Sequence, residues 1–261
     1  DRDSIVRKKV ILNFDDDDPN IKIGFKIEVN NQTQIYPLLD GLDRYVNPLR
    51  FKNNDYRSDG MKLIEIFRSL QGEGPAMGRP ALFIRLSGCN LNCKGCDTDL
   101  KPSLDLSILE LLKRIEGQGK RVIITGGEPT LQMNELVDLI CRLYSRGMEI
   151  HIESNGTNII PLEILEKICC AVVSPKRGSD FNLGFWANKS NVHLKFVLGK
   201  PDWCWNEEEL KQLIPILDRE RVWIMAYGAD QGMQNASEAW DLALKLGTNY
   251  SDRLHIRLKR S

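Results

Sequence analysis

From residue 61 onward, short apolar runs rich in Ile, Val and Leu alternate with segments of helical pattern. The runs expected to form strands are 62–67, 81–86, 121–125, 149–153, 171–174, 192–198, 221–226 and 254–258. Continuous apolar runs are typical of parallel strands that are covered on both faces. The alternation predicts an α/β domain with a mainly parallel sheet, either open or curled into a partial barrel. In such sheets the chemistry lies at the carboxyl ends of the strands.

Start and stop signals place helices between several of these runs. A helix over 105–116 is expected to begin at Ser103 or Asp105, because short polar side chains cap helix amino ends. A second helix near 134–146 is expected to end before Gly147, since Gly is favoured just beyond a helix.

The first sixty residues have a different composition, with no Cys, His, Trp or Met. Their apolar residues follow strand patterns at 10–14, 21–29 and 33–38. We therefore expect a small β-rich N-terminal extension with a linker over 1–60, followed by one domain over 61–261.

Charge and hydropathy exclude several classes of function. The chain has 36 Lys plus Arg and 36 Asp plus Glu, so its formal net charge is zero. A neutral chain is not suited to coating nucleic acid or an anionic membrane, and we expect neither partner. No apolar run approaches the length of a membrane span, and the first residues carry no export-signal pattern. We expect a cytoplasmic protein.

The seven cysteines do not follow the pattern of a disulfide scaffold. Their number is odd, and two of them, Cys169 and Cys170, are adjacent. A reducing compartment is the better setting. Cys141, Cys169, Cys170 and Cys204 lie in or beside expected elements, so we expect them to be buried apolar fillers.

The other three cysteines, Cys89, Cys93 and Cys96, lie within eight residues, directly after the expected strand 81–86. Three thiolates on one loop can converge on a single metal centre. Structural zinc normally takes four protein ligands, and every histidine is far away in the sequence. A four-iron, four-sulfur cluster held by three cysteines keeps one iron open for an outside ligand, so we favour a [4Fe-4S] cluster over zinc.

These residues resemble the radical S-adenosylmethionine (SAM) superfamily, in which SAM ligates the open iron. The segment Ile124-Thr125-Gly126-Gly127-Glu128-Pro129 follows a strand and is similar to the glycine-glycine-glutamate element of that superfamily, which contacts the amino group of SAM. Two Gly residues allow a close backbone approach, and a carboxylate suits an ammonium group. The resemblance implies a partial (β/α) barrel of the radical SAM type.

A narrower resemblance is to the 7-carboxy-7-deazaguanine synthase family. The matching segments are Phe67-Arg68-Ser69-Leu70-Gln71-Gly72-Glu73-Gly74, Phe83-Ile84-Arg85-Leu86, Cys96-Asp97-Thr98, Ser174-Pro175-Lys176 and Leu254-His255-Ile256-Arg257-Leu258. They occur in the family's order and together cover roughly residues 61–258.

This resemblance implies a role for each matching residue. Cys89, Cys93 and Cys96 would hold the cluster, and Thr98 would ligate Mg²⁺, which prefers hard oxygen ligands. The residues implied in SAM binding are Gly95, Cys96, Asp97, Gly127, Glu128, Glu153, Ser154, Asn155, Ser174, Pro175 and Lys176. The residues implied in substrate binding are Leu70, Gln71, Gly72, Glu73, Arg85 and Thr125. Arg85 would pair with a substrate carboxylate, which a guanidinium can bind in a bidentate manner.

The implied reaction is a ring contraction. SAM would be cleaved to a 5′-deoxyadenosyl radical that converts 6-carboxy-5,6,7,8-tetrahydropterin to 7-carboxy-7-deazaguanine with loss of ammonia, in queuosine-type biosynthesis. The resemblance also implies a reductant such as flavodoxin or ferredoxin, and a homodimer. Two alternatives stay open: a glycyl-radical-enzyme activase, which shares the cysteine loop, and a cluster-bearing regulatory module in which the extension binds a partner.

One residue departs from the superfamily pattern. Gly95 precedes the third cysteine, where the superfamily usually has an aromatic residue that packs near the adenine of SAM. Adenine binding in this chain must therefore depend on the backbone or on other side chains.

Overall fold

A nine-stranded sheet organises most of the described chain, with strand order β12-β11-β10-β9-β8-β7-β5-β4-β6. The computed structural model describes residues 9–11, 24–29, 32–37, 60–96, 98–187, 189–228 and 233–259, and from the first three ranges it gives the strands alone. The strands of the sheet are β4 (Met61–Leu70), β5 (Pro80–Leu86), β6 (Leu104–Leu106), β7 (Arg121–Gly126), β8 (Glu149–Ser154), β9 (Cys170–Val173), β10 (Val192–Leu198), β11 (Val222–Ala226) and β12 (Asn249–Ser251). From β5 to β12 neighbouring strands are parallel, whereas β4 is antiparallel to both β5 and β6.

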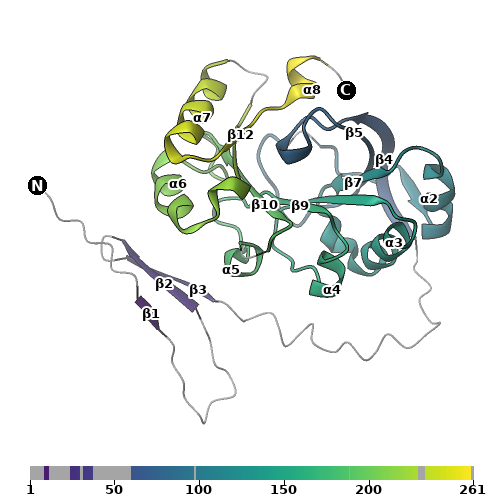
Figure 1. Cartoon of the computed structure of the whole chain (residues 1–261), viewed down its shortest axis with the longest axis horizontal. Helices are drawn as coiled ribbons and strands as arrows, with labels where there is room; N and C mark the ends of the chain where they lie inside the picture. Colours follow the sequence, from purple (N-terminus) through teal and green to yellow (C-terminus); the bar gives the residue numbers. More distant parts are fainter. Residues whose placement is uncertain are drawn as a thin grey trace, which may run out of the picture.

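Helices cover one face of this sheet. Figure 1 shows α2 to α6 along its outer side, with α8 on the other side. The α-helices are α2 (Ile108–Ile115), α3 (Met133–Ser145), α4 (Leu162–Leu165), α5 (Leu183–Trp186), α6 (Glu207–Leu213), α7 (Met233–Leu246) and α8 (Leu254–Arg257). Short 3₁₀ turns are η2 (Gly74–Ala76), η3 (Pro129–Gln132), η4 (Ile214–Ile216) and η5 (Arg219–Arg221).

The residues before 60 contribute a separate antiparallel sheet with order β1-β2-β3. Its strands are β1 (Lys9–Ile11), β2 (Gly24–Val29) and β3 (Gln32–Pro37). Strands were expected in all three regions, and the first is shorter and begins earlier than predicted.

The two faces of the large sheet differ in composition because side chains alternate along each strand. On the face that we call the helix face, Leu82, Ile84, Ile124 and Ile152 belong to one continuous buried core with the helices. We call the opposite side the site face. Its residues, at the intervening positions, include the charged and polar side chains Arg85, Thr125, Glu153 and Lys195.

Local signals in the sequence explain where the helices begin and end. Ser107 caps α2 in a reciprocal capping box with Glu110, and Asn206 does the same for α6 with Glu209. The helix expected near 134–146 is confirmed as α3, and Gly147 follows it with φ of +67°.

The expected strands from 62–67 to 221–226 are confirmed, and the sheet does not close on itself, in agreement with the expected partial barrel. Two expectations were wrong. Residues 104–106 pair with β4 as strand β6, so the following helix begins after Ser107 and not at Ser103 or Asp105. The predicted strand 254–258 is helix α8, while the last strand is β12.

The alternation of apolar and charged residues in 254–258 resembles a strand, but the backbone there makes helical hydrogen bonds. The Leu258 amide donates to the Leu254 carbonyl at 3.0 Å, four residues earlier. The described helices include none that is both long and apolar enough to cross a membrane.

Candidate active site

The three cysteines predicted to hold a cluster lie on the loop that follows β5, at the carboxyl end of the parallel strands. All three are free thiols; Cys89 and Cys93 are partly exposed and Cys96 is exposed. The Cys96 amide donates to the Cys93 carbonyl at 3.1 Å, so these two residues share one turn. Burial raises the pKa of the Cys93 thiol, and nearby Lys176 opposes that rise.

The glycine turn after β7 packs directly on the start of the cysteine loop. The Gly127 amide donates to the Leu86 carbonyl at 3.0 Å, and the Glu128 amide donates to the Gly88 carbonyl at 2.8 Å. A Cβ at Gly127 would overlap the Gly88 carbonyl oxygen, and one at Gly126, where φ is +136°, would overlap the Leu86 backbone. Only glycine allows this close approach of the two turns.

Glu128 is enclosed within the protein and joins the glycine turn to the end of β8. Its carboxylate accepts hydrogen bonds from the Thr130 amide at 3.1 Å, the Ser154 hydroxyl at 2.9 Å and the Asn155 amide at 2.6 Å. The Thr130 hydroxyl is a further donor, at 2.6 Å. Because the side chain has no exposed surface, it acts on neighbouring groups by holding Ser154 and Asn155 in place.

Asn155 connects this network to the cysteine loop. Its Nδ2 donates to the Asn90 side chain at 2.9 Å and lies 4.0 Å from the Cys89 sulfur. The end of β8 and the cysteine loop are therefore one hydrogen-bonded unit.

The segment Ser174–Lys176 follows β9 at the same edge of the sheet. The Ser174 amide donates to the Ser154 carbonyl at 2.8 Å. Lys176 Nζ donates to the Ser174 hydroxyl at 2.8 Å and lies 5.5 Å from the centre of the Trp203 ring. Burial lowers the pKa of Lys176. The residues implied in SAM binding on three separate strands thus meet beside the cysteines.

On the site face, Glu153 joins two residues that were predicted to bind substrate. Its carboxylate accepts from the Gln71 side-chain amide at 2.9 Å and from the Thr125 hydroxyl at 2.7 Å. Glu153 itself was predicted to bind SAM together with Ser154 and Asn155. Alternation along β8 turns Glu153 toward the predicted substrate residues and Ser154 toward Glu128.

Arg85 lies on the same face, beside Thr125 in the register of β5 and β7. Its Nε donates to Glu65 Oε1 at 2.8 Å, and its guanidinium lies 5.5 Å from the centre of the Phe67 ring. Phe67 stacks on Phe83 with ring centres 4.9 Å apart. Arg85 is thus oriented by its neighbours, while about a quarter of its side chain stays exposed, at 26%.

Tyr227 occupies the space that a side chain at Gly95 would need. Gly95 has φ of +78°, and a Cβ there would overlap the Tyr227 hydroxyl. Tyr227 packs edge-on against Trp203 at 5.5 Å, and Trp203 Nε1 donates to the Lys94 carbonyl at 2.9 Å. Aromatic side chains therefore do contact this part of the cysteine loop, but they come from after β10 and β11.

Three further residues were predicted to belong to the site. Leu70 is 51% exposed at the end of β4. Thr98 is partly exposed on the segment that leads from the cysteine loop toward β6. Asp97 lies outside the described residues.

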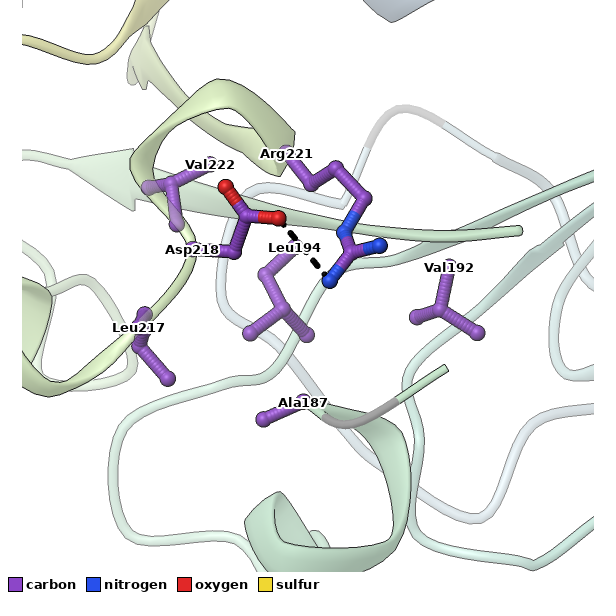
Figure 2. A pocket seen from close by; sticks show the side chains of 7 residues that line it. All are labelled: Ala187, Val192, Leu194, Leu217, Asp218, Arg221 and Val222. Atoms are coloured by element: carbon purple, nitrogen blue, oxygen red, sulfur yellow. Dashed lines mark ion pairs between the residues drawn. The ribbon is translucent and has the colours of Figure 1, made fainter. Parts of the chain in front are cut away.

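Two cavities lie away from the cysteine loop. A cavity of about 10 Å³ on the helix side of β10 and β11 is about the size of one water, and Asp218 and Arg221 pair across its rim at 3.0 Å (Figure 2). A larger one, of about 230 Å³, lies at the amino ends of β8 to β10. It is lined by Pro75, Ala76, Arg79, Glu149, His151, Cys169, Cys170 and His193.

Burial lowers the pKa of both histidines in the larger cavity, which favours their neutral form.

Four cysteines outside the cysteine loop were expected to be buried. Cys170 and Cys204 are buried and Cys141 is partly buried. Cys169 is exposed, so for Cys169 the expectation was wrong.

The donor set on the cysteine loop fits an iron–sulfur cluster better than a hard cation. Three free thiols offer soft sulfur ligands, and their partial exposure leaves access from outside the protein. Within the described residues, no three His, Cys, Asp or Glu side chains have the spacing that would hold a single metal ion.

Sequence reasoning missed Lys195 and Arg253, which both contact Glu73. A signal was present for Lys195, because a lysine is unusual in an apolar strand such as Val192–Leu198, whose other polar residue is His193. Arg253 had no such signal, because its partner lies 180 positions away in the sequence.

The open parallel sheet and the cysteine loop at its carboxyl edge define a protein of the radical SAM class. Residues 83–174, which include the loop and the glycine turn, match the family model described as the Radical SAM superfamily. The chain is also 32% identical to 7-carboxy-7-deazaguanine synthase of Hyperthermus butylicus, over 75% of this chain and 92% of that protein. The chain belongs to the 7-carboxy-7-deazaguanine synthase family.

One further relative agrees with this assignment, and a solved structure agrees with the fold. Over 56% of its length, the chain is 41% identical to 7-carboxy-7-deazaguanine synthase of Methanospirillum hungatei and covers 64% of that protein. The crystal structure of QueE from Escherichia coli has the same fold, with a TM-score of 0.57 at 24% identity, over 75% of this chain and 95% of that one.

Proposed function

We propose that the chain converts 6-carboxy-5,6,7,8-tetrahydropterin to 7-carboxy-7-deazaguanine with loss of ammonia. The observation that carries this proposal is the polar group on the site face, where Glu153 holds Gln71 and Thr125 beside Arg85. A flat, polar, anionic ligand needs such a combination of amide, hydroxyl, carboxylate and guanidinium groups. Family membership supplies the class of reaction.

Cys89, Cys93 and Cys96 would hold a [4Fe-4S] cluster, with SAM on its open iron. When bound, the two supply the one-electron chemistry of the reaction. The groups that would hold SAM are Gly127, Ser154, Asn155 and Ser174–Lys176, which surround the cysteine loop at one edge of the sheet. Glu128 contributes by fixing Ser154 and Asn155, since its own oxygens are occupied.

The chain's own residues bind and orient the pterin on the site face. Arg85 would bind its carboxylate, exchanging part of the contact with Glu65 for a bidentate pair. The amide of Gln71 and the carboxylate of Glu153 would form hydrogen bonds with the polar edge of the pterin ring. Phe67 and Phe83 keep water away from one side of Arg85, which strengthens its electrostatic interactions.

The finer assignments belong to the same proposal. Thr98 would ligate Mg²⁺ together with substrate oxygens. Flavodoxin or ferredoxin would reduce the cluster, the enzyme would be a cytoplasmic homodimer, and 61–261 would be the catalytic domain with 1–60 as an extension.

An anaerobic assay tests the reaction directly. The purified chain is reconstituted with iron and sulfide, then supplied with SAM, Mg²⁺, dithionite and carboxytetrahydropterin, and the product is identified by mass spectrometry. We expect 7-carboxy-7-deazaguanine and recovery of SAM. Cleavage of SAM without that product would overturn the proposal in favour of another radical SAM reaction, such as that of an activase. The matched control is Cys93→Ala treated in the same way.

A further inference from the structure

Three charged side chains from distant parts of the chain meet on the site face. Glu73 follows β4, Lys195 lies on β10 and Arg253 follows β12. Lys195 Nζ donates to one carboxylate oxygen of Glu73, and Arg253 Nε lies 3.2 Å from the other. We call these three residues the latch. Their side chains are only 16%, 7% and 16% exposed, respectively.

The latch is not explained by stability alone. Taking charges out of water is costly, and a buried ion pair is often no more stabilising than apolar residues of similar size. Burial alone would raise the pKa of Glu73, but Lys195 and Arg253 outweigh it and lower that pKa to about 2. The carboxylate is therefore kept charged although it is largely buried.

The latch joins two segments that cross the site face. The Gly74 amide donates to the Ser251 hydroxyl at 2.9 Å in a buried hydrogen bond, and the Leu254 amide donates to the Gly72 carbonyl at 2.9 Å. The His255 ring lies against Gly72 so closely that a Cβ there would overlap the imidazole. The turn 71–74 and the C-terminal segment 251–257 thus form one unit around Glu73.

The same turn carries a residue of the proposed substrate site. Gln71 Nε2 donates to Glu153, and Gln71 Oε1 accepts from the Glu73 amide at 3.2 Å. A movement of Glu73 would therefore change where Gln71 and Glu153 point.

We propose that Lys195 and Arg253 are positioning residues: by holding Glu73, they fix the turn 71–74 against the C-terminal segment and set the geometry of Gln71 and Glu153 for the substrate. The ligand named here, a carboxypterin, rests on the proposed function. The latch itself rests on contacts within the chain.

Amide hydrogen exchange of the cofactor-free protein tests the latch independently of the reaction. Arg253→Met removes one cation while it keeps the length and apolar stem of the side chain. We expect the Gly74 and Leu254 amides to exchange at least about tenfold faster than in the wild type, because their hydrogen bonds join the two segments. Arg253→Lys should recover most of the protection.

Arg257→Met is the matched control, since Arg257 lies on the same segment but pairs with Asp252 at 3.0 Å. We expect it to leave the exchange of the Gly74 amide unchanged. Unchanged exchange of both amides in Arg253→Met, or an equal increase in Arg257→Met, would overturn the latch.

Steady-state kinetics and SAM binding test the positioning role. We expect Arg253→Met and Lys195→Met to raise KM for carboxytetrahydropterin by about tenfold or more, with SAM affinity unchanged by equilibrium dialysis, and Lys195→Arg to restore KM in part. Faster exchange with an unchanged KM would overturn the positioning role. If the wild type made no deazaguanine product, the proposed function would fall, and the exchange rates would still decide the latch.

Discussion

The helix face and the site face are built from the same strands, yet they differ in almost every property. Ile124 and Ile152 on the helix face have no exposed surface and belong to one apolar core with the helices. Their neighbours Thr125 and Glu153 bond to each other on the opposite side. One residue along the strand therefore separates a packing role from a chemical one.

This difference teaches how a parallel sheet can hold charged groups without losing its core. The site face carries two small apolar clusters: Phe67 packed against Ala81, Phe83 and Ile123, and Val197, Cys204 and Met225 with Trp203 and Tyr227. The stability of the sheet depends on the helix face, so the site face can carry polar residues at modest cost. We expect substitutions on the helix face to lower stability mainly, and substitutions on the site face to lower activity mainly.

The largest effect should come from the cysteine loop, at the edge where the two faces end. Cys93→Ala should abolish bound iron, the brown absorbance and product formation together, since a three-thiolate site loses one ligand. The far-ultraviolet circular dichroism should stay that of the wild type. Iron analysis and absorbance after anaerobic reconstitution check this, and full iron content in the variant would refute the ligand assignment.

On the helix face, Ile152→Ala should lower the free energy of unfolding by about 2–5 kcal/mol, because it leaves a cavity in a fully buried core. Its neighbour on the site face, Glu153→Gln, should change that free energy by less than about 1.5 kcal/mol while it weakens substrate binding. Urea unfolding measures both. Equal destabilisation by the two variants would contradict the claim that the helix face contributes more to stability than the site face.

Arg85→Met should raise KM for carboxytetrahydropterin by about tenfold or more while SAM cleavage and iron content stay the same, because the carboxylate loses its partner. Glu65→Gln is the control, since it removes the ion pair of Arg85 and leaves the guanidinium free to bind substrate. Steady-state kinetics separate the two. An unchanged KM in Arg85→Met would show that Arg85 serves only in the ion pair with Glu65 and does not bind the substrate.

The pH dependence of stability should report Glu73. Its pKa is about 2 in the folded protein and 4.5 for the ordinary group. A lowered pKa contributes stability that is fully present above about pH 4.5 and is lost as the pH falls toward about 2. Urea midpoints at several pH values should therefore show wild type and Glu73→Gln converging over that window. A constant difference would contradict the pairing with Lys195 and Arg253.

The smallest effect concerns the contact between Gly95 and Tyr227. Gly95→Ala should cost about 1 kcal/mol or more, since φ is positive and the new Cβ meets the Tyr227 hydroxyl. Adding Tyr227→Phe, which removes that hydroxyl, should recover part of the loss. Thermal unfolding of the two variants checks this, and no recovery would show that strain at Gly95 alone sets the cost.

The sequence was sufficient to predict most of the sheet and the cysteine loop, because each depends on local pattern. Runs of Ile and Val define the strands, and the spacing of Cys89, Cys93 and Cys96 defines the loop. Strand alternation alone could also have predicted that the side chains of Glu153 and Ser154 lie on opposite faces, with Glu153 on the site face.

The contact between Glu73 and Arg253 and the helix α8 could not be predicted in this way. The pattern of 254–258 fits a strand as well as a helix, and tertiary contact with Gly72 accompanies the helical choice. Likewise, nothing near Arg253 in the sequence points to Glu73. Such contacts depend on the folded topology, which single-sequence patterns do not encode.

The long separation between Glu73 and Arg253 has a consequence for biosynthesis of the protein. The two residues are 180 positions apart, so the turn 71–74 leaves the ribosome long before its partner segment exists. The hydrogen bonds described for the cysteine loop, by contrast, reach Thr157 and Trp203, and Tyr227 packs on Gly95. During translation, much of the surroundings of the cysteines can therefore form before Arg253 emerges and completes the latch.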